Sequence, residues 1–74
     1  MTVKERTIYL INGLSNYSLW KYMNEFEKWV SISHYIDMGM EISARQYASL
    51  ERFYDMCGWP MPQCKVRPEE EIGI

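Results

Sequence analysis

One short stretch of the chain gathers the residue types of nucleophilic catalysis. Ser31, Ser33, His34 and Asp37 supply two hydroxyls, the chain's one imidazole and a carboxylate. A catalytic triad, however, is an arrangement in space, and closeness along the chain carries little information about it. Catalysis needs a nucleophile, a base and an orienting group within reach of one another. In 74 residues with one histidine we expect no such set, so the sequence predicts no catalytic residues and no enzyme.

Cys57 and Cys64 carry the other reactive side chains. Zinc sites usually take four ligands from close pairs such as Cys-x2-Cys, and two cysteines with His34 are too few. The four glycines are isolated, so no glycine-rich phosphate loop is present. We therefore expect neither a metal nor a cofactor. The first residues form no apolar secretory signal, so we expect free thiols and a cytoplasmic location.

Four polar side chains on a helix predicted over residues 44–57 are the candidates for contacting DNA. They are Arg45, Gln46, Ser49 and Arg52, and a helix that opens in this way resembles the recognition helix of a helix-turn-helix. The charge gives little support, because eight Lys and Arg face ten Asp and Glu. Without Glu69, Glu70 and Glu71 the balance is eight against seven, or +1, whereas DNA binding relies on phosphate neutralisation. A helix-turn-helix-like DNA-binding regulator is therefore the alternative function.

Large aromatic and thioether side chains are the most unusual feature. The chain has six Tyr, three Trp, two Phe and six Met, and a domain of this size cannot enclose all of them. These residue types are enriched at protein interfaces. Those that we assign to partner binding are Trp20, Tyr35, Met56, Trp59 and Met61.

The leading hypothesis is therefore a small module that binds another protein and modulates it, by inhibition in the simplest case. Short, aromatic-rich, acidic chains resemble the small regulators of phages and mobile elements. Formation of a homo-oligomer would also cover exposed aromatic side chains. No apolar run reaches the roughly 18 residues of a membrane span, so we expect no membrane partner and little role for nucleic acid.

The clearest helical pattern begins near Ser18. Six apolar residues recur at helical spacing and share one arc of the helix: Leu19, Tyr22, Met23, Phe26, Trp29 and Val30. Asp37 would fall at the centre of the same arc. We therefore expect this helix to end near Ser31.

A second helix is predicted from Ala44 to about Cys57. Ser43 is a suitable N-cap, and Gln46 three residues later completes a capping box. Gly58 can end the helix in a left-handed conformation, and Pro60 prevents its continuation.

The patterns of two segments are compatible with either a helix or a strand. A capping box from Thr2 to Glu5 and a glycine at Gly13 indicate a helix over residues 3–12, yet the apolar run of residues 8–11 is equally typical of a buried strand. Residues 30–42 read either as a hairpin that turns at 37–39 or as a short helix after Ser33 that ends at Gly39.

We favour the helical interpretation of both segments, because short helices can cover one another through local contacts. The expected fold is one small, mainly α domain of three to four short helices over residues 1–68. The alternative is an α+β fold with a sheet of two or three strands. Residues 59–68, which contain three prolines, are expected to lie extended over the domain. Residues 69–74 are expected to form an acidic, disordered tail.

Overall fold

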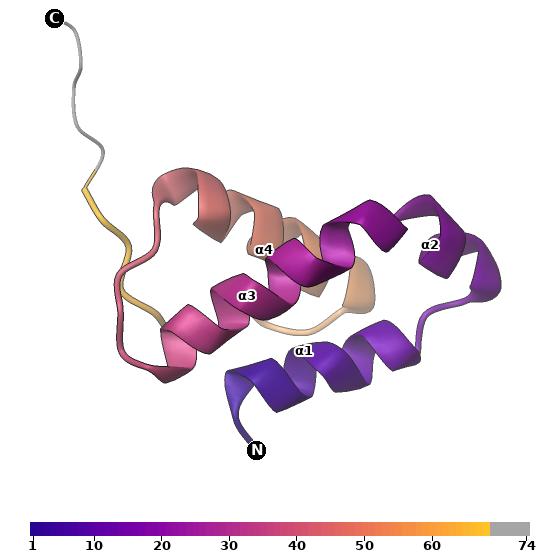
Figure 1. The fold of residues 1–74 in the computed structure, drawn as a ribbon, viewed down its shortest axis with the longest axis horizontal. Coiled ribbons are helices and arrows are strands. Elements are labelled where there is room, and N and C mark those ends of the chain that lie inside the picture. Colours follow the sequence, from indigo (N-terminus) through magenta and orange to yellow (C-terminus); the bar gives the residue numbers. More distant parts are fainter. Residues whose placement is uncertain (69–74) are drawn as a thin grey trace, which may run out of the picture.

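The computed structural model describes residues 1–68 and shows a mainly helical fold (Figure 1). Its elements are α1 (Val3–Asn12), α2 (Asn16–Lys21), a 3-10 turn η1 (Met23–Glu25), α3 (Phe26–Asp37) and α4 (Ala44–Cys57). The prediction of a mainly α fold is confirmed. The described residues contain no strand longer than a single parallel bridge between Ile42 and Val66. The predicted tail, residues 69–74, lies outside the described residues.

Local capping explains where α1 and α4 begin. The hydroxyls of Thr2 and Ser43 accept hydrogen bonds from the third amide of each helix, and the side chains of Glu5 and Gln46 accept from the cap amides in return. Both capping boxes satisfy amides that a helix start otherwise leaves unpaired. Gly58 ends α4 at a φ of 75°, a conformation that a side chain disfavours. The predicted bounds of both helices are confirmed.

The predicted helix from Ser18 to Ser31 is wrong at both ends. The chain leaves helical geometry at Tyr22, where φ is −108° and ψ is 15°, and a separate helix, α3, starts at Phe26. This break turns Met23 outward, so its assignment to a buried arc is also wrong. Leu19 and Tyr22 still pack against the core.

At its other end, α3 continues past Ser31 to Asp37 because the polar residues on its buried side have partners. The hydroxyl of Ser33 donates to the carbonyl of Trp29 (2.9 Å). The carboxylate of Asp37 accepts from the amides of Val3 and Lys4. Asp37 thus caps α1 from another helix, so it interrupts the apolar arc without ending the helix.

The central element of the fold is α3, which packs against both α1 and α4 (Figure 1). The core lies between these three helices and beneath the loop before α4; its fully apolar or aromatic members are Leu10, Ile11, Trp29, Ile32, Ile42, Leu50, Phe53 and Tyr54. After Gly58 the chain returns along the domain, and Met61 and Cys64 pack against the core. None of the four α-helices described has the length and apolar character needed to cross a membrane.

Candidate protein-interaction site

Helix α2 presents large apolar side chains to solvent. Ser15 begins it by accepting a hydrogen bond from the amide of Ser18 (3.2 Å), and the helix has no buried residue. The exposed fractions of Tyr17, Trp20 and Met23 are 65%, 72% and 58%. Tyr17 and Trp20 are three positions apart, so they lie on one side of the helix. We call these three side chains, of Tyr17 and Trp20 on α2 and of Met23 on the 3-10 turn η1 that follows, the α2 surface.

A cation lies beside this surface. The ammonium group of Lys21 is 5.7 Å from the ring centre of Tyr17 and 5.4 Å from that of Tyr22. Cation–π contacts of this kind contribute roughly 0.5–1 kcal/mol at exposed sites. Lys21 therefore places a cation beside the Tyr17 ring, on the same short helix as the exposed Trp20.

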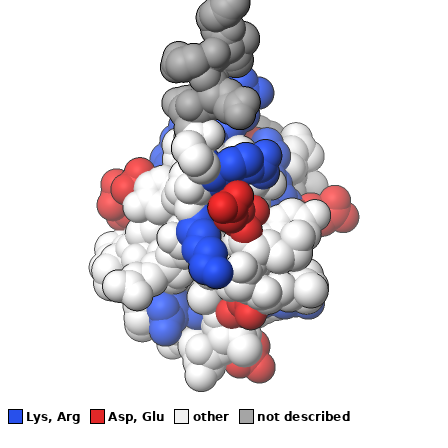
Figure 2. All heavy atoms as spheres, turned by 90° about the vertical axis from the view of Figure 1, so that its left-hand side faces the viewer, with Lys and Arg blue, Asp and Glu red and all other residues white. Residues whose placement is uncertain are grey.

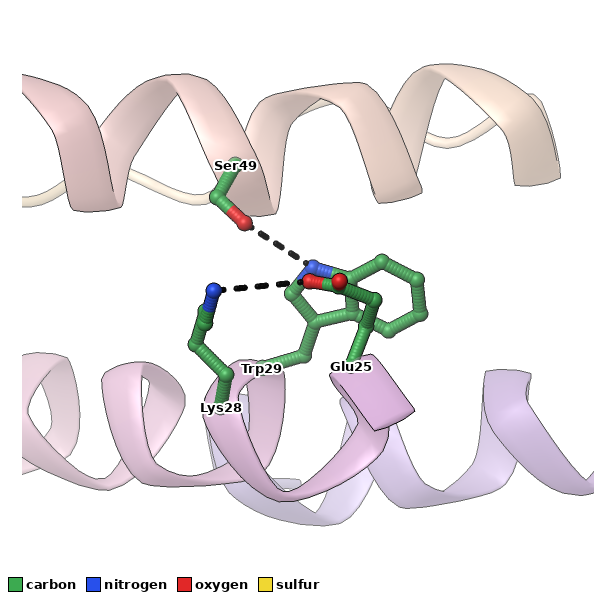
Figure 3. Close-up of polar contacts among 4 residues, drawn as sticks. All are labelled: Glu25, Lys28, Trp29 and Ser49. Carbon is green, nitrogen blue, oxygen red and sulfur yellow. Dashed lines mark hydrogen bonds and ion pairs between the residues drawn. The ribbon is translucent and has the colours of Figure 1, made fainter. Parts of the chain in front are cut away.

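Aromatic packing supports the α2 surface from below. The rings of Tyr22 and Trp29 are 6.0 Å apart, and Trp29 stacks on Phe53 at 4.5 Å. The indole nitrogen of Trp29 donates to the hydroxyl of Ser49 (3.2 Å), which joins α3 to α4 (Figure 3). A ladder of rings therefore runs from α2 through α3 into α4.

Figure 3 also shows the ion pair beside this ladder. The ammonium of Lys28 lies 3.6 Å from the carboxylate of Glu25, one turn earlier on the chain. Both side chains are substantially exposed, so the pair adds little stability. Its effect is local, because it neutralises the charges at the start of α3.

The structure distributes the five predicted partner-binding residues over different elements. Trp59 follows α4, is 42% exposed, and has the Arg6 guanidinium 5.7 Å from its ring centre. Tyr35 on α3 and Met56 on α4 are also exposed, whereas Met61 is partly buried against the core. Within residues 1–68, no aromatic contact joins Trp20 to Trp59.

Sequence reasoning missed two residues of the α2 surface. Tyr17 precedes the predicted start of the helix, and Met23 was assigned to the buried arc. The signal that could have found Tyr17 is Ser15, a suitable N-cap that moves the helix start back to Asn16. An earlier start places Tyr17 beside Trp20. No such local signal marks Met23, which follows the break at Tyr22.

The residues considered for catalysis do not form a site. Ser33 is fully buried and bonded, and Asp37 caps α1, while His34 is exposed. His34 borders a hollow of about 410 Å³ between α1 and α3, whose floor is formed by Phe26 and Val30. No nucleophile is held against its imidazole by a hydrogen bond among the described residues.

The two thiols lie apart in the fold. Cys57 borders a hollow of about 310 Å³ next to Tyr9 and Leu14, and Cys64 borders another, of about 300 Å³, next to Met40. Burial raises the pKa of both thiols, which lowers their reactivity. Residues 1–68 contain no cluster of three or more side chains that could hold a metal ion.

Two of the four residues considered for DNA binding have partners within the chain. Gln46 completes the capping box of α4, and Ser49 accepts the hydrogen bond from Trp29. Arg45 and Arg52 are exposed.

Comparisons with known protein families, curated proteins and solved structures find no match to this chain. Its function therefore has to be argued from its own surface.

Proposed function

We propose that this chain is a small protein-interaction module whose α2 surface contacts another protein. The observation that carries the proposal is the position of Trp20, which is 72% exposed on a helix with no buried residue, three positions after the exposed Tyr17. Exposed apolar patches of this kind are typical of interaction sites.

The composition of the α2 surface also fits partner binding. Trp and Tyr supply large contact areas with few rotatable bonds, and they are over-represented among interface residues whose truncation costs at least about 2 kcal/mol. The aromatic ladder beneath holds the helix in place before a partner binds, and such preorganisation reduces the entropic cost of association. Modulation of the partner, by inhibition in the simplest case, is part of this proposal, as is a cytoplasmic location, which suits the free thiols.

The test separates binding from folding. Trp20→Ala should leave the free energy of unfolding in urea nearly unchanged, because most of the indole is exposed, while capture of a partner from the source cell is lost. Ile8→Ala is the matched control, since Ile8 is also exposed but lies on α1. A Trp20→Ala protein that unfolds readily, or that captures the same partner as wild type, would remove the proposal.

Trp59→Ala is a second comparison. Its ring lies against Arg6, so we expect some loss of stability as well as any loss of binding. Sedimentation of wild type and Trp20→Ala over a range of concentrations tests whether a second copy of the chain is the partner. Concentration-dependent dimers that Trp20→Ala abolishes would identify a homo-oligomer.

DNA binding through Arg45, Gln46, Ser49 and Arg52 stays the alternative prediction. It has less support because two of those four side chains have intramolecular partners. Retention on a nonspecific duplex at low salt that falls steeply with added salt would favour it.

A further inference from the structure

Two extended segments pair through one parallel bridge near the end of the described chain. The amide of Ile42 donates to the carbonyl of Lys65 (2.9 Å), and the amide of Arg67 donates to the carbonyl of Ile42 (2.8 Å). Ile42 is fully buried, so the bridge fixes residues 65–67 against the domain. We call the outer side of Lys65, Val66 and Arg67 the Val66 edge.

The backbone of Val66 faces away from this bridge. In an extended strand the amide and carbonyl of successive residues point to opposite edges. Because Lys65 and Arg67 bond to Ile42, the amide and carbonyl of Val66 point outward. Within residues 1–68 neither group has a hydrogen-bond partner, and Val66 is 40% exposed. An edge with a free donor and acceptor is a template for the addition of another strand.

The side chains of the Val66 edge carry positive charge. Lys65 and Arg67 are exposed and alternate with Val66, so they share one face of the segment. The one ion pair within residues 1–68 joins Lys28 to Glu25. Lys65 and Arg67 therefore have no carboxylate partner among these residues. Figure 2 views the end of the molecule where α3 leads into α4, and shows Lys and Arg side chains close to one acidic side chain.

The opposite face of the segment carries Cys64 and Val66, which are two residues apart. The hollow of about 300 Å³ beside the segment is lined by Cys64 and Lys65 but not by Val66. A strand added to the edge would place every second side chain beside Val66 and the others beside the two cations.

We propose that the Val66 edge binds an extended acidic peptide segment of another protein by strand addition. The peptide backbone pairs with the amide and carbonyl of Val66. Its carboxylates lie opposite Lys65 and Arg67, and an apolar residue between them lies beside the exposed side chain of Val66. The Val66 edge is separate from the α2 surface, so this inference does not rest on the proposed function.

The first test uses a six-residue peptide that alternates glutamate with valine, blocked at both ends, titrated into the full chain and followed by backbone amide NMR. The amide signals of Val66 and its neighbours should shift most. A peptide with lysine in place of glutamate should bind at least about tenfold more weakly, because it meets like charge. Equal affinity for the two peptides, or shifts centred elsewhere, would overturn the inference.

Two variants separate the backbone contribution from the charge contribution. Val66→Pro removes the outward amide and spares both bridge hydrogen bonds, which use the Lys65 carbonyl and the Arg67 amide. It should weaken binding of the glutamate peptide about fivefold to tenfold. The double reversal K65E/R67E should exchange the preference, so that the lysine peptide now binds better. The matched control, R45E/R52E on α4, should keep the original preference. Unaltered affinity in Val66→Pro, or no exchange in K65E/R67E, would refute strand addition of an acidic segment.

The third experiment tests whether the chain's own acidic residues compete with the peptide. Changing Glu69, Glu70 and Glu71 to Gln in the full chain should leave the affinity for the glutamate peptide within about twofold. If that peptide binds only after this change, the chain's own C-terminal segment is the occupant and a separate partner is excluded.

Discussion

The carboxylate of Asp37, at the last turn of α3, accepts a hydrogen bond from the amide of Val3 at the first turn of α1 (2.8 Å). Its second oxygen accepts from the amide of Lys4, also at 2.8 Å. A helix start carries unpaired amides and a partial positive charge, so a carboxylate is favourable there. One side chain therefore joins two helices and completes the cap that Thr2 begins.

Asp37→Ala should lower the free energy of unfolding by about 1–2 kcal/mol, because two amides at the start of α1 lose their acceptor. Asp37→Asn should cost less, since one oxygen remains. Urea denaturation followed by circular dichroism measures both. Asp55→Ala is the control, since Asp55 is exposed on α4. Equal stability of Asp37→Ala and Asp55→Ala would show that the contact contributes nothing.

A chain of buried hydroxyls leads to a second prediction. Thr7 lies 2.6 Å from Ser33 and 2.9 Å from Tyr54, and Ser33 donates its proton to the carbonyl of Trp29. Thr7 must then donate to Ser33, which leaves Tyr54 to donate to Thr7. The protons therefore run in one direction, from α4 through α1 to α3.

Thr7→Val should cost about 1–3 kcal/mol, because it leaves the buried phenol of Tyr54 without an acceptor. Tyr54→Phe should cost less, since Thr7 then loses only a donor and keeps its own bond to Ser33. The double variant should cost less than the sum of the two single changes. Thermal and urea unfolding of the three proteins check this order, and a Tyr54→Phe protein less stable than Thr7→Val would reverse the assigned direction.

The third prediction concerns alkaline pH. Burial raises the pKa of Tyr54 above its ordinary value of 10.0 and the pKa of Cys57 and Cys64 above 9.0. Between the two pKa values of each group, the unfolded chain has released a proton that the folded chain still holds. Stability is therefore fully present below about pH 9 and falls as pH rises.

Tyr54→Phe should reduce the decline above about pH 10, and the pair Cys57→Ser and Cys64→Ser should reduce the decline that begins near pH 9. Melting temperatures measured from pH 7 to 11 test both. Parallel curves for wild type and the variants would mean that these groups do not control the alkaline transition.

The fourth prediction compares two glycines that end helices. Gly58 has a φ of 75°, whereas Gly13 has a φ of −89°. Added methyl groups meet nothing within 4 Å at Gly58 and only ordinary contacts of 3.6 and 3.7 Å at Gly13. Gly58→Ala should therefore cost about 1 kcal/mol through backbone strain alone, and Gly13→Ala should be neutral or slightly stabilising. The difference between their urea midpoints is the measurement.

The sequence by itself determined the helix over residues 44–57, where both ends carry local signals, and it favoured a helix over residues 3–12 while leaving a buried strand open. Thr2 with Glu5 and Ser43 with Gln46 are capping boxes, and Gly58 is a helix end. Such signals act within one turn, so their outcome does not depend on the remainder of the chain. They favour a mainly helical fold. The prediction that some large aromatic side chains stay exposed follows instead from their number in a domain of this size.

Only the tertiary structure decided how residues 15–38 are divided. Asp37 interrupts the apolar arc of α3, and its partner is an amide 34 positions earlier in the chain. The spacing of apolar residues along a helix takes account only of the polarity of each residue. It cannot include a hydrogen-bond partner that another helix supplies, as α1 does for Asp37. The exposure of Met23 was missed for the same reason. Whether Met23 faces the core or the solvent depends on the break at Tyr22, whose ring packs against Trp29 on the next helix.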